Sequence, residues 1–429
     1  MHYIVIFFRK MSGSLADLAD LRFSLLNFEW LFQSRYAILS ADGKFLRIFP
    51  KLAEKRRWIP SMEFFRNFSS NTLAGSGNQS FFLPEDADTV YTGRIFYRIF
   101  AGGSNRYSFL FSNIVDSTFS DGSHSHMNLL CDQWRVVRAA AGVCRSCTAE
   151  TMARVEYFQP LTFSGAAGKE VMPGEFFSSD PVTLDLDRGD YICLELSFQG
   201  SMIPCHEESI LPAFVLTGDS WKPSKHLPFA GMVGCDRNTA LRIGFLGDSI
   251  TQGIGTEPNS YDHWNAKLAE MLGEKYACWN LGLGFGRAED AASDGAWLFK
   301  AKQTDVAVVC FGVNDLFQTG DTEKLQRNLD RIVTLLQAAG VKVVVQTIPP
   351  FDYSGDLIDK WRQVNRYILE RLSQKADLVF DVVPVLQRSE SKPYLARYGG
   401  HPDREGCQAW ADALFSVLKP FLDTLVPRL

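Results

Sequence analysis

The chain has 429 residues, a length that favours two folded domains over a single core. Its hydrophobic content of 46% and charged content of 22% are ordinary for a globular protein in water. The formal net charge is −5, and the sequence has no long basic run. These features argue against nucleic acid as a partner.

The N-terminal region, residues 1–90, has the least regular pattern. We expect part of it to be an arm or loop and part to add strands to the domain that follows. Residues 69–79 are rich in Ser, Asn and Gly and predict a loop. The apolar run ending at Phe8 has its basic residues after it and no cleavage site, unlike a signal peptide. No run approaches the roughly 20 apolar residues of a membrane span. We therefore expect a cytoplasmic protein with no membrane partner.

Residues 91–225 show short alternating stretches separated by turns rich in Gly, Asn, Asp and Ser. This rhythm is typical of an antiparallel β-sandwich or jelly roll. The stretches that predict strands are 94–100, 107–111, 182–186 and 191–198. Residues 102–105 and 187–190 predict turns between them. Residues 226–239 contain Pro and Gly and are expected to link this domain to the next.

Residues 240–429 alternate short apolar runs with amphipathic helical patterns. The runs that predict strands are 241–246, 276–281, 305–311, 341–347 and 377–383. Helical patterns follow, with one apolar face on 325–336 and another on 361–372. Such alternation predicts an α/β domain with a parallel sheet between two helix layers, a three-layer, flavodoxin-like arrangement.

Chemically useful residues stand where these strands end. Ser249 follows the first strand, in the sequence Gly-Asp-Ser. A glycine-rich segment containing Gly284 follows the second strand, and Asn314 follows the third. His401 precedes a final helical pattern, and Pro402 is expected at the first position of that helix. Because ligands of open α/β sheets bind at the carboxyl ends of strands, we expect these residues to meet.

Together they supply the parts that a serine hydrolase requires. A nucleophile needs a base within hydrogen-bond reach and donors for the developing oxyanion. Ser249 is the nucleophile in this hypothesis and His401 the base, with the Asn314 amide and backbone N–H groups as donors. Asp248 and Asp315 are expected to support the neighbouring loops. The alternative for Ser249 is a simple helix cap.

These blocks resemble the SGNH, or GDSL-type, hydrolase superfamily, named for Ser, Gly, Asn and His in that order. Ser249, Asn314 and His401 match three of the four positions. The glycine position falls on Phe285, flanked by Gly284 and Gly286, and any of the three backbone N–H groups could be the donor; we favour Gly284. Residues 91–225 more loosely resemble the β-sandwich domain that precedes the hydrolase domain in some members.

One departure from the family concerns the acid that orients the histidine. The family commonly has Asp three residues before the histidine, whereas this chain has Tyr398. Three alternatives follow. A main-chain carbonyl near Tyr398 orients His401 in a Ser–His dyad, an acid comes from elsewhere, or the enzyme is weak. In triad enzymes, loss of the acid's help costs up to about 10⁴ in kcat.

The resemblance implies a serine esterase that needs no metal and no cofactor. We expect a short acyl group, with acetyl favoured, because no long apolar lid segment is evident. The superfamily includes carbohydrate acetylesterases, so a small-molecule or sugar-bearing ester is the expected substrate, and an oligomer is compatible with the sequence. A non-catalytic carbohydrate-binding or scaffold protein is the alternative. The glycines 282, 284 and 286 lack the G-x-G-x-x-G spacing of a dinucleotide site, since Arg287 occupies its last position.

Overall fold

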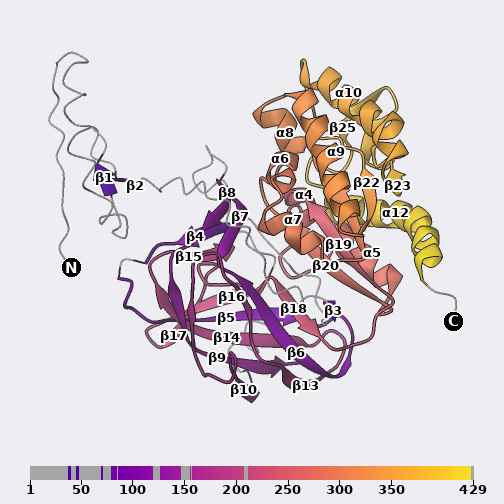
Figure 1. Ribbon diagram of the computed structural model, residues 1–429. Helices are drawn as coiled ribbons and strands as arrows, with labels where there is room; N and C mark the ends of the chain where they lie inside the picture. Colours follow the sequence, from indigo (N-terminus) through magenta and orange to yellow (C-terminus); the bar gives the residue numbers. More distant parts are fainter. Residues whose placement is uncertain are drawn as a thin grey trace, which may run out of the picture. The chain divides into compact units, whose positions relative to one another are not determined.

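The computed structural model describes residues 37–39, 45–47, 69–70, 79–84, 86–118, 126–145, 155, 157–206 and 211–426. The chain forms two compact units, residues 1–58 and 59–429. In the first unit, strand β1 (Ala37–Leu39) pairs with β2 (Phe45–Arg47) in antiparallel fashion. The second unit holds all other described elements, which form an all-β region and an α/β region (Figure 1).

Among its described residues, the all-β region contains two larger antiparallel sheets and two smaller sheets of two strands each. The first sheet consists of β10 (Tyr157–Leu161), β9 (Trp134–Cys144), β14 (Tyr191–Gly200), β5 (Tyr91–Arg98), β16 (Ala213–Thr217) and β17 (Ser220–Pro223), with β11 (Lys169–Val171) beside β9. The second consists of β12 (Phe176–Ser178), β6 (Gly103–Ser112), β18 (Met232–Cys235) and β3 (Ser69–Ser70), with β13 (Val182–Leu186) beside β6. The pairs are β4 (Gln79–Phe82) with β15 (Ile203–His206), and β7 (Ile114–Thr118) with β8 (His126–Leu130).

Aromatic side chains from both larger sheets meet in one core. Trp134 of the first sheet packs edge-on against Phe177 of the second, with ring centroids 5.8 Å apart. Tyr97 and Phe109 make a second contact between the sheets, at 6.3 Å. The four strands predicted between residues 94 and 198 are therefore present and bury their alternate apolar side chains. The jelly-roll connectivity stays a prediction.

Three local expectations in and around this region need correction. Residues 232–235, inside the predicted linker, form β18, which pairs with β6 and β3 because Met232 and Val233 are buried apolar residues. The expected loop 69–79 has strand residues at both ends, in β3 and β4. The expected turn 102–105 ends early, since β6 begins at Gly103. The domain boundaries themselves stay predictions.

The α/β region contains a parallel sheet in the order β20-β19-β21-β22-β23. Its strands are β19 (Leu241–Gly247), β20 (Tyr276–Gly282), β21 (Val306–Cys310), β22 (Lys342–Gln346) and β23 (Leu378–Phe380). Every pairing in it is parallel, as predicted from the nearly continuous apolar runs. β19, which leads to Ser249, is paired on both sides and lies inside the sheet.

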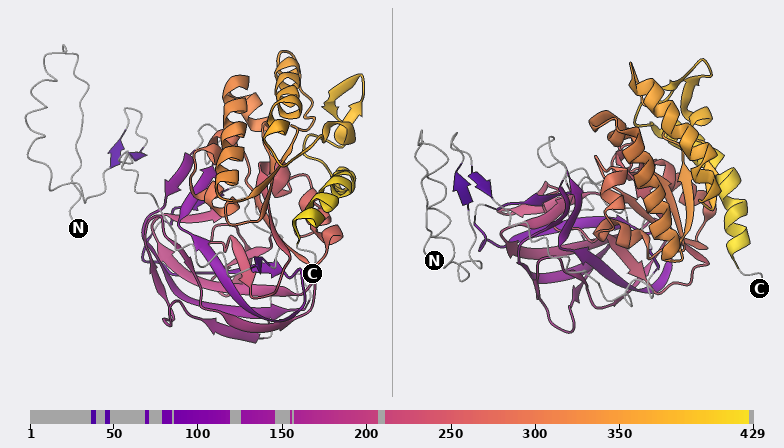
Figure 2. Two further views of the ribbon diagram at one scale, coloured as in Figure 1. Left: turned by 45° about the vertical axis from the view of Figure 1, so that its right-hand side comes forward. Right: turned by 45° about the horizontal axis from the view of Figure 1, so that its top comes forward.

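Helices alternate with these strands (Figures 1 and 2). They are α4 (Ser249–Gln252), α5 (Trp264–Leu272), α6 (Ala288–Ala292), α7 (Ala296–Ala301), α8 (Val313–Gln318), α9 (Thr322–Ala338), α10 (Leu357–Glu370), the 3₁₀ turn η2 (Leu372–Gln374), α11 (Val383–Leu386) and α12 (Arg404–Leu425). A short antiparallel pair, β24 (Gln387–Ser389) and β25 (Lys392–Ala396), precedes α12.

The apolar faces predicted for two of these helices are buried. In α9 the buried face runs from Leu325 to Leu336, and in α10 it includes Trp361 and Val364. Helix α5 contacts α12, where Trp264 stacks on Trp410 at 4.9 Å, whereas α9 contacts α6, α7 and α10. The assignment of these two groups to separate layers stays a prediction.

The two regions meet along β20. This strand is at one edge of the parallel sheet, yet all seven of its residues are buried. Trp279 donates a hydrogen bond to the Gly231 carbonyl at 2.9 Å, and Arg237 donates to the carbonyl of Tyr276, also at 2.9 Å. Apolar residues of both regions form one continuous core. The all-β region therefore covers an edge that would otherwise offer unpaired backbone groups.

In the part of the chain that the structure describes, no helix combines the length and the apolar character needed to cross a membrane.

Candidate active site

Ser249 begins a short helix immediately after the inner strand β19. The chain turns sharply there: a Cβ at Gly247 would lie 2.2 Å from Thr251 Oγ1 and 2.6 Å from the Cys310 carbonyl oxygen, so only glycine fits. Asp248 caps the helix by accepting a hydrogen bond from the Ile250 N–H at 3.0 Å. Because Asp248 is the cap, the Ser249 hydroxyl is available for another partner.

That partner is His401. Ser249 Oγ lies 2.8 Å from His401 Nε2, although 152 positions separate the two residues in the chain. Both side chains are only partly buried, so a substrate can reach them. This is the hydrogen-bonded contact expected between a nucleophile and its general base.

The imidazole of His401 lies in an apolar setting. The ring of Phe351 packs edge-on against it, with centroids 5.3 Å apart and planes at 78°. Burial lowers the pKa of His401 below its ordinary value, since the imidazolium form loses hydration there. A low pKa keeps the ring neutral, which is the form that can accept a proton from Ser249.

The segment before His401 does not supply the expected orienting group. The carbonyl of Tyr398 accepts a hydrogen bond from the Asp403 N–H at 3.2 Å and so closes the loop before α12. The Tyr398 side chain lies against Gly406, where an added Cβ would be 2.5 Å from the Tyr398 Cβ. Among the residues that the structure describes, His401 Nδ1 has no hydrogen-bond partner, neither a carbonyl nor a carboxylate.

The start of α12 also differs from the prediction. Pro402 stands before the cap and not at the first helical position, because Asp403 is the cap residue. The Asp403 carboxylate accepts hydrogen bonds from the N–H groups of Glu405 and Gly406, at 3.0 and 2.9 Å. This cap leaves His401 in the loop, outside the helix.

Asn314 reaches the same edge of the sheet from helix α8. Its Nδ2 donates a hydrogen bond to the Gly286 carbonyl at 3.0 Å. The amide carries a second N–H, which this bond leaves available. Asn314 thus joins the loop after β21 to the glycine-rich loop after β20.

The glycine-rich loop has three candidate N–H donors. The Gly286 N–H already donates to the Leu283 carbonyl at 3.1 Å, and Phe285 adopts a left-handed φ of 60° with a 42% exposed side chain. The Gly284 N–H makes no hydrogen bond with the described residues. The Gly286 N–H is thus already used, and the choice of Gly284 over Phe285 stays a prediction.

Two buried carboxyl groups support the site without touching Ser249. Burial, with a smaller contribution from the neighbouring Asp315, raises the pKa of Asp248 to about 7. Burial also raises the pKa of Asp315 to about 6. Asp315 accepts a hydrogen bond from the Ala288 N–H at 3.0 Å and so holds the start of helix α6. The supporting role of both residues stays a prediction.

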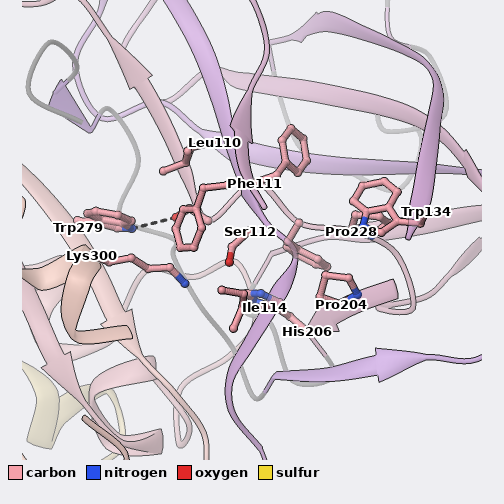
Figure 3. A pocket seen from close by; sticks show the side chains of 13 residues that line it. Leu110, Phe111, Ser112, Ile114, Trp134, Pro204, His206, Pro228, Trp279 and Lys300 are labelled. Carbon is pink, nitrogen blue, oxygen red and sulfur yellow. Dashed lines mark hydrogen bonds between the residues drawn. The ribbon is translucent and has the colours of Figure 1, made fainter. Parts of the chain in front are cut away.

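A separate pocket lies where the two regions meet, and none of the candidate site residues lines it. Figure 3 shows Trp279 and Lys300 on one side of it, facing Phe111, Ser112 and Ile114 of the all-β region. His206, also in its lining, is fully buried and stacks on Phe229 at 4.9 Å. This pocket belongs to the contact between the regions and not to the Ser–His pair.

No set of three or more His, Cys, Asp or Glu side chains in the described ranges is arranged to hold a metal ion.

A comparison with known families matches the part of the chain that holds these residues. The model of the GDSL-like lipase/acylhydrolase family matches residues 245–409. Residues 245–409 are thus similar to the SGNH, or GDSL-type, superfamily. The match includes Ser249, Asn314 and His401, the residues that the structure brings to one edge of the sheet. The all-β region lies outside the matched residues.

Solved structures similar to the chain include three with related names. A member of the lipolytic G-D-S-L family from Veillonella parvula is 17% identical, with a TM-score of 0.33, and the match covers 42% of this chain and 98% of that one. An esterase from Pseudoalteromonas is 16% identical, with a TM-score of 0.33 and the same coverage. The acetyl xylan esterase AlAXEase is 21% identical, with a TM-score of 0.34, covering 41% of this chain and 99% of that one. No curated protein matched the chain.

Sequence reasoning missed the aromatic neighbours of His401. Phe351 follows β22 by a few residues, at the same end of the sheet as Ser249, and Phe317 lies in α8 just after Asn314. The ring centroids of these two residues are 5.6 Å apart. Their positions after strand ends could have indicated them, since that is where the other site residues were found.

Proposed function

We propose that this protein is a serine esterase in which Ser249 attacks an ester carbonyl. The contact of 2.8 Å between Ser249 Oγ and His401 Nε2 is the observation that carries the proposal. His401 takes the serine proton during attack and gives it to the leaving alcohol. Water, activated by the same imidazole, then releases the acyl group from Ser249.

Three donors are proposed to hold the oxyanion. The Ser249 N–H is in the first turn of α4, where a backbone donor has no partner within the helix. The Gly284 N–H and the second N–H of the Asn314 amide complete the set. Removing one such donor in other serine hydrolases costs about 10²–10³ in kcat.

The imidazole works without an acid in this proposal. His401 is held by Ser249 on one side and by the Phe351 ring on another, and its neutral form is favoured by burial. An enzyme built this way is expected to be slower than a full triad, because no carboxylate among the described residues bonds to the imidazole to stabilise the imidazolium as it forms.

The substrate is proposed to be a short-chain ester, with acetyl the favoured acyl group and a sugar-bearing alcohol the favoured partner. The acyl length rests on the lack of a long apolar lid segment in the sequence of residues 240–429. The alcohol rests on the resemblance to a superfamily that includes carbohydrate acetylesterases, which is an argument by analogy.

Hydrolysis of 4-nitrophenyl acetate and covalent labelling by a fluorophosphonate test the proposal directly. We expect the wild-type chain to release nitrophenol and to be labelled on Ser249, and S249A to do neither. Conversion of acetylated xylo-oligosaccharides, compared with acetylated small alcohols, then tests the substrate class. If the wild type neither hydrolyses nor reacts, the non-catalytic carbohydrate-binding alternative replaces the esterase.

A further inference from the structure

The hairpin β7–β8 of the all-β region packs against helix α7 of the α/β region. Asn128, on strand β8, accepts a hydrogen bond from the Ala296 N–H at 3.1 Å through its Oδ1 and donates one to Ser293 Oγ at 3.0 Å through its Nδ2. Ala296 is the first residue of α7, and the cap residue Gly295 has no side chain that could serve this N–H. Asn128 therefore acts as the helix cap from another part of the chain.

The fit at this cap is close. A Cβ at Gly295 would lie 1.7 Å from Asn128 Oδ1, so glycine is required there for the asparagine to approach. Asn128 itself has a left-handed φ of 54°, a conformation that asparagine tolerates better than most residues. The backbone of β8 is thus shaped to present this side chain.

The same hairpin makes a second contact with α7 one turn later. Asp116, on strand β7, forms an ion pair with Lys300, and both side chains are buried. Figure 3 shows Lys300 reaching from the α/β region to the side of the pocket where Ser112 and Ile114 lie. The hairpin thus holds α7 at its first residue and again at Lys300.

Helix α7 in turn shapes the glycine-rich loop. Trp297, the second residue of α7, donates a hydrogen bond to the Leu281 carbonyl at 2.8 Å. Its ring covers Gly286, where a Cβ would lie 2.5 Å from Trp297 Cη2. The Gly286 carbonyl accepts the hydrogen bond from Asn314. A shift of Trp297 would therefore displace both the glycine-rich loop and the Asn314 amide, which are the proposed sources of oxyanion donors.

We propose that Asn128 is a positioning residue for the oxyanion donors, acting through α7 and Trp297. The all-β region then contributes to the rate of the reaction and not only to substrate binding or stability. This inference rests on the proposed esterase function for its catalytic part. Its structural part, the dependence of residues 282–287 on Asn128, can be tested without any activity.

The main variant is N128G, which removes the cap while tolerating the left-handed backbone. N128D keeps the acceptor for the Ala296 N–H and serves as the conservative rescue. L130A, on the exposed part of the same strand, is the matched control for loosening the hairpin. All variants are made in the full chain and compared well below their unfolding temperatures.

We expect N128G to lower kcat for 4-nitrophenyl acetate by about tenfold or more, with KM changed less than twofold, because small displacements of oriented groups cost about 10²-fold. Affinity for a trifluoromethyl ketone, which mimics the tetrahedral oxyanion, falls by the same factor. N128D and L130A stay within about twofold of the wild type in kcat. Amide hydrogen exchange in residues 282–287 becomes faster in N128G only.

Two results would overturn the inference. Unchanged exchange in residues 282–287 of N128G removes the structural link, whether or not the wild type is active. Faster exchange with an unchanged kcat removes the catalytic part. A wild type that neither hydrolyses esters nor reacts with fluorophosphonate refutes the proposed function instead, and the exchange comparison then decides the structural part alone.

Discussion

Phe351 and His401 meet almost at right angles, with ring centroids 5.3 Å apart, and the imidazole is partly buried there. The pKa of His401 is lowered by this burial, with no nearby charge to counter it. The neutral base therefore persists to lower pH than an ordinary histidine allows, and activity is lost as pH falls through the folded-state pKa.

We therefore expect kcat/KM for 4-nitrophenyl acetate to fall on the acid side with an apparent pKa below 6.5. The variant F351A admits water to the ring and is expected to move that pKa upward. A pH–rate profile of both proteins measures the shift. If the two profiles coincide, Phe351 does not control the pKa of His401.

Tyr398 offers a test of the missing acid. Aspartate at this position restores the spacing to the histidine that the superfamily commonly has. We expect Y398D to raise the pKa of His401, because a carboxylate within about 4–6 Å favours the imidazolium. The same carboxylate should increase kcat by about tenfold or more, part of the roughly 10⁴ that an acid supplies in triads.

The matched control for that change is Y398N, which has the same shape without the charge. Both variants lose the contact of the tyrosine ring with the start of α12, so any common loss of stability cancels. Identical pH profiles and kcat values for Y398D and Y398N would show that residue 398 cannot reach the imidazole.

Because Asp248 is buried, we expect the free energy of unfolding to depend on pH. Its pKa is about 7 in the folded protein, above its ordinary value of 3.8, so the folded state holds a proton that the unfolded state releases. The contribution of Asp248 is therefore fully present below about pH 4 and is lost as pH rises to about 7. The variant D248N keeps an oxygen to cap α4 but does not titrate.

Urea unfolding at pH 4.5 and pH 8 measures this effect. We expect D248N to gain stability relative to the wild type when the pH is raised from 4.5 to 8, as measured by the free energy of unfolding. The corresponding variant D403N, at the cap of α12, is the control for replacing a capping carboxylate. A difference that is the same at both pH values contradicts the buried, protonated state of Asp248.

From the position of Phe317 we expect the protein to prefer esters with an aromatic alcohol. Its side chain is 50% exposed and packs against Phe351, which lies beside His401. Because the proposed mechanism has His401 give its proton to the leaving alcohol, we expect these rings to lie on the leaving-group side. We expect F317A to raise KM for phenyl acetate by about threefold to tenfold, the range of one aromatic contact, and to leave ethyl acetate nearly unchanged.

Steady-state kinetics on the two esters check this prediction. The exposed aromatic Phe285, on the glycine-rich loop, provides the comparison variant F285A. If F317A raised KM for both esters by the same factor, Phe317 would not contact the leaving group.

The parallel sheet could be predicted because each strand is a nearly continuous apolar run, and a strand covered on both faces requires such a run. Ser249 and Asn314 could be predicted because a parallel sheet gathers the ends of its strands, whereas His401 was found by its place before the last helical pattern. The Ser–His contact spans 152 positions, yet the order of elements was enough to bring the two residues to one edge.

Contacts between the regions could not be predicted in this way. Asn128 carries no periodic or motif signal, and its role depends on how a hairpin packs against a helix far away in the chain. Strand β18 was hidden because Pro and Gly residues surround a run of only four buried residues. The position of Pro402 was missed because Asp403, one residue later, is the stronger cap.

The burial of β20 has a consequence for expressing the α/β region as a separate fragment. A fragment beginning near residue 240 would retain every residue of the Ser–His site but would lose the segments that cover this strand, among them Gly231 and Arg237. Its bare edge would invite strand addition from a second molecule, and the fragment would tend to aggregate. We therefore expect that the α/β region is not a free-standing module, and that shortening the chain would reduce its solubility before it altered the Ser–His contact.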